Sequence, residues 1–500
     1  MFTNFKGNNL ADSYHKEKLK KRFKMSGYIK ALIAAVISIV IALLPTEAFG
    51  IEGLNPVQQR VIAIFVFAAI AWLTEAIPSW CTSTLIIVVM LFTVSNYSLT
   101  PLMDVEGAKY VSYKSIMACF ANPTILLFIG GFILAIALTK TGLDVILAKK
   151  LLIPFGSKPS MVLLGFILVT ATFSAFVSNT ATAAMMLAFL TPVLRAMPEG
   201  SKDRAALALA IPLGANIGGI ATPIGTPPNT IVLGYLDEQL GIGVGFGEWM
   251  LKIIPFVLIL LFCGWMILRF LFPFQQKEIH LVIDGEFHWT YKAWIVIITF
   301  AITIFLWCFA DVFDLGLNCY IVALFPVAIF AVSGIITKKD LEEINWAVLW
   351  MVAGGFALGV CLAETGLDKV LIGSIPFSKF SPALVMILAA LVCFGFSNFI
   401  SHSAAASLLV PVLGVVAGAL MHPTDPSVAP LSQGGAVQML LYVAIAASVS
   451  MILPISTPPN AIAHSTGFIK QSDMMKVGAA VGVLGLVIGY FWLKLPFIFG

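Results

Sequence analysis

The chain has 500 residues and a formal net charge of +4, and 60% of its residues are hydrophobic while only 11% are charged. Soluble proteins carry about a quarter charged residues, so this composition, with a mean hydropathy of +1.00, excludes a water-soluble globular protein. Long apolar runs without alternation predict transmembrane helices and not a closed barrel, and about eleven spans fit the chain. The seven cysteines show neither metal-binding nor disulfide spacing.

The first segment, residues 1–27, is basic and has no small-residue cleavage site behind a short apolar core. Lys and Arg gather on the cytoplasmic side of membrane proteins, so we expect an uncleaved cytoplasmic N-terminus and a first span within residues 28–53. The later basic and acidic loops alternate in a way that predicts a C-terminus outside. We interpret the basic run as an orientation signal and not a nucleic-acid site, in a multi-pass protein of the cell (inner) membrane.

From residue 54 onward the chain repeats itself. Gly130-Gly131-Phe132 recurs as Gly354-Gly355-Phe356 at an offset of 224, and other motifs follow in the same order. We expect repeat 1 in residues 54–274, a cytoplasmic linker in 275–291 and repeat 2 in 292–500. Each repeat crosses the membrane an odd number of times, so the second copy should be inverted. Two inverted repeats around a midplane site are typical of secondary transporters.

Two segments are predicted to form re-entrant hairpins. Residues 160–195 are apolar on both sides of Ser178-Asn179-Thr180, and residues 381–415 are arranged in the same way around Ser397-Asn398. Non-helical backbone at membrane depth is tolerated where it lines a cavity. The alternative is a polar cap between two ordinary helices.

Each hairpin is followed by a span that contains tandem prolines, near residues 225–229 and 456–460. Two successive prolines remove amide donors and clash with the preceding turn, so each span should be unwound there. The freed carbonyls can coordinate a cation, and the helix N-termini can bind an anion. The alternative is a simple proline kink without ligand contact.

The chemistry of these motifs points to an anion. No Lys or Arg lies near the tips, so an anion would be held by Asn amides, Ser and Thr hydroxyls and helix ends. That set fits carboxylates or sulfate, and two tips suggest one for each end of a short dianion. A membrane protease or prenyltransferase would need His-Glu-x-x-His or paired Asp-rich motifs, which do not occur. We therefore expect a transporter and no enzyme.

At these motifs the sequence resembles the divalent anion/sodium symporter family, which carries di- and tricarboxylates or sulfate, over nearly the whole chain after residue 50. The resemblance implies an all-α membrane protein with elevator-type alternating access, and a homodimer whose protomers each have a scaffold and a transport domain. The substrate contacts that it implies are Asn179, Thr180, Thr226, Pro227, Ser397, Asn398, Thr457 and Pro458. The first sodium site that it implies is formed by Ser174, Ser178, Asn179 and the Gly225 backbone, and it implies no other cofactor.

The second half departs from the family pattern. The expected Ser-Asn-Thr is Ser397-Asn398-Phe399, and Cys393 stands five residues before the Asn, where the first half has Ser174. A thiol and a phenyl ring are poor ligands for a hard cation, so a second sodium site at Cys393, Asn398 and Ser456 is doubtful.

His402 lies one turn beyond the expected second tip, where the first half has Ala183. As imidazolium it would supply the positive charge that sodium otherwise provides. We therefore favour a sodium-independent exchanger of small dicarboxylates of the succinate, malate, fumarate and 2-oxoglutarate class. The alternatives are that His402 only packs on the hairpin and that the protein is a sodium-coupled dicarboxylate or sulfate symporter.

Overall fold

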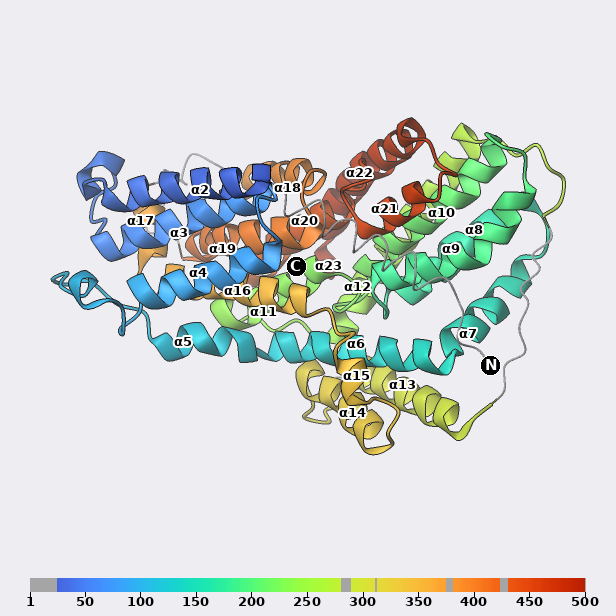
Figure 1. Cartoon of the computed structure of the whole chain (residues 1–500), viewed down its shortest axis with the longest axis horizontal. Helices are drawn as coiled ribbons and strands as arrows, with labels where there is room; N and C mark the ends of the chain where they lie inside the picture. Colours follow the sequence, from blue (N-terminus) through green and yellow to red (C-terminus); the bar gives the residue numbers. More distant parts are fainter. Residues whose placement is uncertain (1–24, 280–288, 311–312, 375–380, 423–429, 500) are drawn as a thin grey trace.

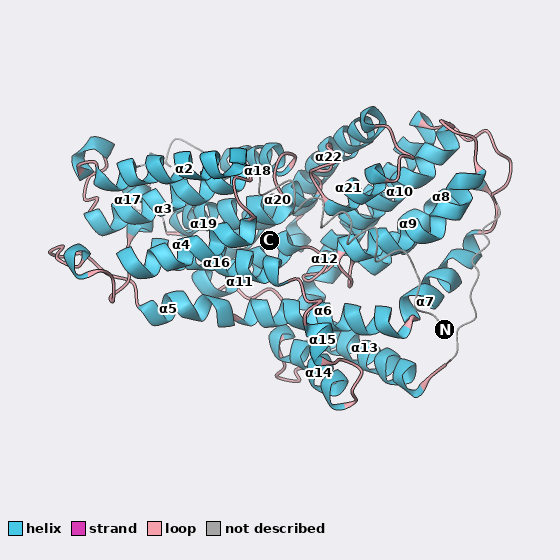
Figure 2. Cartoon of the chain, viewed as in Figure 1, coloured by secondary structure: helices cyan, strands magenta, loops and turns pink. Residues whose placement is uncertain are grey.

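The computed structural model describes residues 25–279, 289–310, 313–374, 381–422 and 430–499. The basic run before residue 25 and the acidic centre of the predicted linker, with Asp284 and Glu286, lie outside these ranges. Within them every regular element is a helix (Figures 1 and 2), and one isolated bridge joins Ser95 to Val111. Eight of the described helices are long and apolar enough to cross a membrane. The prediction of an all-helical, multi-pass membrane protein is confirmed.

The helices of the first half are α2 Met25–Leu43, α3 Pro56–Leu73, α4 Ser79–Thr93, α5 Tyr113–Ala118, α6 Pro123–Thr141, α7 Leu143–Leu152, α8 Pro159–Ser174, α9 Asn179–Ala196, α10 Lys202–Gly218, α11 Pro227–Leu240 and α12 Phe246–Leu271. Those of the second half are α13 Tyr291–Phe309, α14 Cys319–Val332, α15 Lys338–Leu341, α16 Trp346–Glu364, α17 Leu367–Ser374, α18 Pro382–Ser397, α19 His402–Met421, α20 Gln433–Ser448, α21 Pro458–Ser465, α22 Gln471–Leu493 and α23 Pro496–Phe499. Several apolar helices have fewer than 18 residues. The number of eleven spans therefore stays a prediction.

Local sequence accounts for where the helices begin. Proline stands in the first turn of α3, α6, α8, α11, α18 and α21, where its missing N–H costs no helical hydrogen bond. Serine, threonine or asparagine caps many of the others, and Ser178 and Ser401 cap α9 and α19 by accepting from the backbone N–H three residues on. Both hairpins therefore present a capped helix N-terminus at their tips.

The recurring Gly-Gly pairs allow close helix packing. A Cβ added at Gly130 would lie 2.9 Å from the carbonyl carbon of Ala323, because α6 packs directly on α14. A Cβ added at Gly354 would lie 2.6 Å from Cβ of Ser83, because α16 packs on α4. Small residues let transmembrane helices approach backbone to backbone.

The two halves follow the same order of elements around the predicted hairpins. The helix pair α8–α9 is followed by the broken helix α10–α11, and the pair α18–α19 is followed by the broken helix α20–α21. Figure 1 shows α8 and α9 in the right part of the view, and α18 and α19 to the left of them, with α18 near the middle of the long axis. In addition, α10 packs against α21 and α20 packs against α11. The inverted repeat and its residue bounds stay a prediction that this arrangement supports.

Both breaks fall where the tandem prolines predict them. After α10 comes the short 3-10 helix Gly219–Ala221, and Thr226 is extended (φ −143°, ψ 141°) before Pro227 opens α11. After α20 the chain is not α-helical until Pro458, and Thr457 is extended in the same way (φ −135°, ψ 148°). Each break leaves a non-helical segment that ends in a new helix N-terminus.

Candidate functional site

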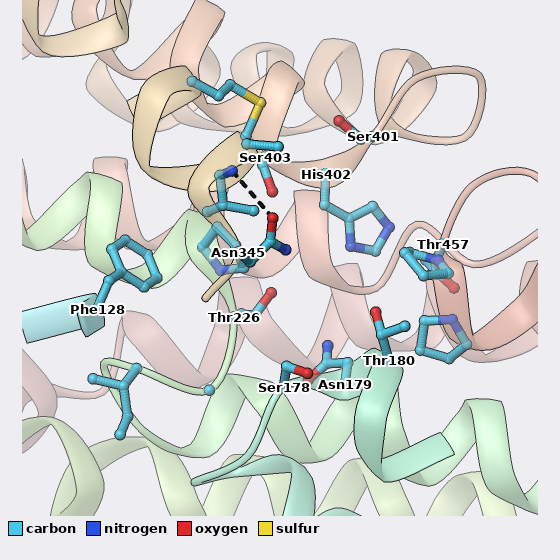
Figure 3. Close-up of a pocket in the computed structure, with 18 of the residues that line it drawn as sticks. Phe128, Ser178, Asn179, Thr180, Thr226, Asn345, Ser401, His402, Ser403 and Thr457 are labelled. Carbon is cyan, nitrogen blue, oxygen red and sulfur yellow. Dashed lines mark hydrogen bonds between the residues drawn. The ribbon is translucent and has the colours of Figure 1, made fainter. Parts of the chain in front are cut away.

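A cavity of about 240 Å³ lies where the starts of four helices meet. The starts of α9 and α19 and the two extended threonines before α11 and α21 line it. Helices α4, α6 and α16 contribute more of the wall, including Trp80, Phe128 and Asn345, and α10 contributes Asn216. Figure 3 shows Ser178, Asn179 and Thr180 on one side of this cavity, opposite Ser401, His402 and Ser403.

The three residues of the predicted first tip lie together at the start of α9. Ser178, Asn179 and Thr180 line the cavity, and the Ser178 Oγ accepts from the Ala181 N–H at 3.2 Å. Because the first N–H groups of α9 have no partner within the helix, this end carries a partial positive charge. Thr226, Pro227, Thr457 and Pro458 line the same cavity.

The second tip is not formed by the predicted residues. Ser397 is the last residue of α18 and Asn398 follows it, and neither lines the cavity. The Asn398 side chain is engaged elsewhere, because its Nδ2 donates to the Phe394 carbonyl at 2.8 Å and its Oδ1 accepts from the Ile452 N–H at 2.9 Å. Ser401, His402 and Ser403 line the cavity in their place.

The helix boundaries explain this difference. Our alignment of the second hairpin with the first was shifted by one helical turn. Both α8 and α18 begin with proline and have 16 residues, so Ser397 corresponds to Ser174, not Cys393. Likewise, Ser401 and His402 correspond to Ser178 and Asn179 at the starts of α19 and α9. The segments Phe173-Ser-Ala-Phe-Val-Ser-Asn and Phe396-Ser-Asn-Phe-Ile-Ser-His show the same match in the sequence.

In the first half, oxygen atoms gather behind the tip. The buried Ser174 Oγ lies 2.6 Å from Asn179 Oδ1 and 2.7 Å from the Ala215 carbonyl oxygen, and its single proton can be donated to either of them. A Cβ added at Gly219 would lie 2.7 Å from Asn179 Oδ1 and 3.1 Å from the Gly225 carbonyl oxygen. Oxygen ligands suit a hard cation such as sodium. Of the residues that the resemblance assigns to the first sodium site, Ser174, Asn179 and Gly225 lie together here, while the Ser178 Oγ caps α9.

The corresponding place in the second half is different. The His402 side chain is buried, and its Nε2 lies 2.8 Å from the Ser450 carbonyl oxygen. A carbonyl only accepts, so Nε2 carries a proton. By the register of the tandem-proline segments, Ser450 corresponds to Gly219 and Ser456 to Gly225. The imidazole N–H therefore donates to the carbonyl that corresponds to Gly219, whose own carbonyl accepts from Asn229 Nδ2.

The residues assigned to the doubtful second sodium site do not converge. The Cys393 Sγ is buried and lies 3.7 Å from Ser397 Oγ and 3.6 Å from the Val443 carbonyl. Asn398 turns away as described above, and the Ser456 Oγ donates to the Leu453 carbonyl at 2.7 Å. The doubtful second sodium site stays a prediction, and by the helix boundaries His402, not Asn398, stands at the position of Asn179.

The lining of the cavity contains no Lys, Arg, Asp or Glu, and His402 is its one titratable residue among those that the structure describes. Sequence reasoning missed Ser401 and Ser403, which the correct hairpin register would have found. It also missed Asn216, Asn345 and the aromatic residues of the wall, which carry no local sequence signal.

Comparisons with known proteins agree with this architecture. A profile described as "Citrate transporter" (CitMHS) matches residues 69–434. The chain is 31% identical over 500 residues to an uncharacterized transporter of Haemophilus influenzae, covering 95% of this chain and 98% of that one. It is 28% identical over 503 residues to the sodium-dependent dicarboxylate transporter SdcS of Staphylococcus saprophyticus, covering 94% and 92%.

Two further matches are informative about length and fold. An uncharacterized transporter of Schizosaccharomyces pombe is 31% identical over 479 residues, which are 92% of this chain and 52% of that protein, so the chain spans about half the length of that relative. The solved structure of Neisseria gonorrhoeae MtrF, from a class of antimetabolite efflux pumps, has a TM-score of 0.50 at 12% identity and covers 92% of this chain and 97% of that one. This last likeness shows the fold alone. The family match over most of the chain, together with relatives that are transporters throughout, shows that the protein belongs to the citrate transporter family, in agreement with its resemblance to divalent anion/sodium symporters.

Proposed function

We propose that this protein is a sodium-coupled transporter of small dicarboxylates, of the succinate, malate, fumarate and 2-oxoglutarate class. The observation that carries the proposal is the convergence of two hairpin tips and two proline-broken helices on one cavity lined by amide and hydroxyl groups. Helix N-termini and neutral donors bind anions without a fixed positive side chain. Relatives named sodium-dependent dicarboxylate transporter support both the substrate class and the cation.

The sodium ion would be held in the first half. Ser174, Asn179 and the Gly225 carbonyl offer oxygen atoms in one place, and glycine at positions 219 and 225 keeps that place free of side chains. We propose that Ser178, at the adjacent start of α9, completes the site. A cation there would lie directly behind the N-terminus of α9, where it would offset the charge of a bound carboxylate. In the second half His402 takes the equivalent position, so we propose one sodium site at the hairpins and not two.

The favoured interpretation from the sequence, sodium-independent exchange, is the second candidate, and His402 is the observation that favours it. Its Nε2–H already points to the Ser450 carbonyl, so a proton on Nδ1 would make the imidazole a positively charged partner for a carboxylate. Complete independence from sodium would also require the first oxygen cluster to stay without a cation. The names of the relatives favour coupling.

The proposed function also implies a transport mechanism, an oligomeric state and a membrane orientation. We propose that the two halves are inverted repeats, that the part carrying both hairpins moves against a scaffold in an elevator-type mechanism, and that two copies form a homodimer embedded in membrane lipid. We further propose a cell-membrane location with the N-terminus in the cytoplasm and the C-terminus outside. The common order of hairpin and broken helix in both halves supports the first of these statements.

The test uses purified protein in proteoliposomes loaded with unlabelled succinate or left empty, with labelled succinate outside and with or without an inward sodium gradient. Sodium coupling predicts uptake into empty vesicles that requires the gradient. Uptake that needs internal dicarboxylate and ignores sodium would support exchange instead. Absence of uptake for succinate, malate and 2-oxoglutarate under all conditions would contradict both.

A further inference from the structure

The side chain of Asn216 connects the two halves of the molecule at the cavity. Asn216 lies in α10, is 1% exposed and lines the cavity. Its Nδ2 donates to Thr457 Oγ1 at 3.2 Å and to Asn460 Oδ1 at 3.0 Å, both in the second broken helix. An amide from repeat 1 therefore contacts the tandem-proline motif of repeat 2.

The orientation of this amide is fixed by its neighbours. The Asn460 Nδ2 donates to the carbonyls of Met451 at 2.9 Å and Leu453 at 3.2 Å, so the Asn460 Oδ1 must face Asn216. A reversed Asn216 amide would place two acceptor oxygens against each other. Only the Nδ2 of Asn216 satisfies this arrangement, and both of its hydrogens are then used.

The same network determines the direction of the Thr457 hydroxyl. Thr457 Oγ1 accepts from Asn216 Nδ2 and also from the Asn460 backbone N–H at 3.1 Å. A hydroxyl has two acceptor lone pairs and one proton. Because both lone pairs are engaged, the hydroxyl can only donate its proton, and the described residues supply no acceptor for it. We propose that Asn216 is a positioning residue that fixes the Thr457 hydroxyl as a donor to one carboxylate of the substrate.

The other half lacks this device. Counted from the tandem-proline motifs, the position that corresponds to Asn216 is Ala447 in α20, which packs on α11 as α10 packs on α21. Asn229 holds its own broken helix as Asn460 does, because its Nδ2 donates to the carbonyls of Gly219 at 3.1 Å and Thr222 at 2.8 Å. Its buried Oδ1, however, has no hydrogen-bond partner, as expected where the donating amide is missing.

Thr226 is correspondingly unrestrained. Its side chain makes no cap hydrogen bond, whereas the Thr457 side chain accepts from Asn460 N–H. The Thr226 hydroxyl can therefore donate or accept. Resting on the proposed dicarboxylate function, the structure assigns unequal roles to the two threonines. The Thr457 side accepts only an acceptor oxygen and so favours a carboxylate, whereas the Thr226 side can also accept from the N–H of a neutral end such as a primary amide.

A double-mutant cycle tests the inference on the full-length protein in detergent. Succinate affinity is measured by titration calorimetry in sodium buffer for Asn216→Ala, Thr457→Val and the double variant, with Thr226→Val and its combination with Asn216→Ala as the matched control. Loss of a hydrogen bond to a carboxylate corresponds to about tenfold weaker binding. We expect Asn216→Ala alone to weaken succinate binding about tenfold. In the Thr457→Val background it should cause little further loss of affinity, and in the Thr226→Val background it should cause the same loss, about tenfold, as in the wild type. Additive losses in the Thr457 pair overturn the inference.

Two further variants separate positioning from general loss of structure. Thr457→Ser keeps the hydroxyl, so it should bind succinate nearly as the wild type does and remain sensitive to Asn216→Ala. Ala447→Asn supplies the missing amide to Asn229 and Thr226, so it should tighten succinate binding severalfold and reduce binding of the monoamide succinamate relative to succinate. An unchanged ratio of the two affinities in Ala447→Asn contradicts the assigned asymmetry.

The wild-type measurement distinguishes this inference from the proposed function. If the wild-type protein binds sulfate and no small dicarboxylate, the proposed function fails. The cycle is then repeated with sulfate, whose oxygens also accept from the Thr457 hydroxyl. If the wild type binds succinate while the losses at positions 216 and 457 add, the proposed function stands and the role of Asn216 is wrong.

Discussion

The two hairpins have nearly the same helix lengths and caps, but different side chains at their tips. Helices α8 and α18 have equal lengths, and α9 and α19 both start behind a serine cap. In the first hairpin Asn179 faces a cluster of oxygen atoms, whereas in the second His402 places an N–H on the Ser450 carbonyl. A single exchange of an amide for an imidazole thus places an N–H donor where the first half has an amide oxygen.

Removal of the amide in the first hairpin should have the largest effect. Asn179→Ala deletes an oxygen of the proposed sodium site and a group at the cavity wall. Loss of one ligand or positioning group at such a site costs on the order of a hundredfold or more in rate. We expect succinate uptake into proteoliposomes to fall to background.

The control for Asn179→Ala is a gel-filtration profile equal to that of the wild type, which shows that the fold is retained. Uptake at the wild-type rate and with unchanged sodium dependence would mean that the first tip holds neither ion nor anion.

Closing the oxygen cluster with a side chain should have the next largest effect. Gly225→Ser introduces the residue that the second half carries at Ser456, and its Cβ would lie 3.0 Å from the Ala175 carbonyl oxygen, tighter than an ordinary contact. We expect the sodium concentration for half-maximal uptake to rise at least about tenfold, which is the effect of disturbing the groups that orient the ligands of an ion.

Ser456→Gly is the matched variant for this test, because it removes a side chain where we propose no sodium site. Its sodium dependence should stay that of the wild type. Equal responses of the two variants in a sodium titration would show that the halves are not distinguished in this way.

Much of the architecture could be predicted from the sequence because it depends on strong local signals. Apolar runs, tandem prolines and polar tips predict membrane helices, helix breaks and the first hairpin without knowledge of any contact. The sequence places the second tip one helical turn too early because Ser397-Asn398 has the same residues as Ser178-Asn179. Pro382 at the start of α18 and the Ser401 cap of α19 mark the boundaries that the structure shows. Only the fold could reveal Asn216, since its partners Thr457 and Asn460 lie more than 240 positions away.

Restoring the amide in the second hairpin should have a moderate effect. His402→Asn gives α19 the residue that begins α9, and it frees the Ser450 carbonyl from the imidazole N–H. If the histidine replaces a cation, uptake should become more steeply dependent on sodium, and exchange without sodium should fall severalfold, as for loss of one charge-assisted hydrogen bond.

The measurement for His402→Asn is the Hill coefficient for sodium together with succinate–succinate exchange in sodium-free buffer. His402→Ala serves as the control that removes the imidazole without supplying an oxygen. The same Hill coefficient in His402→Asn and in the wild type would indicate that the histidine only packs on the hairpin.

The smallest effect is expected at Cys393, and it tests the corrected register. If Cys393 stood in the place of Ser174, Cys393→Ser would create a sodium ligand. With Ser397 at that place instead, the new hydroxyl would lie one turn deeper in α18, near the Val443 carbonyl, to which it can donate as Sγ does now. A buried polar group that keeps a hydrogen bond changes stability and binding little, so we expect sodium affinity within about twofold of the wild type. Ser397→Ala, in contrast, should lower the sodium affinity if a second cation binds in this half. A pronounced gain of sodium affinity in Cys393→Ser would show that Ser397-Asn398 forms the second tip.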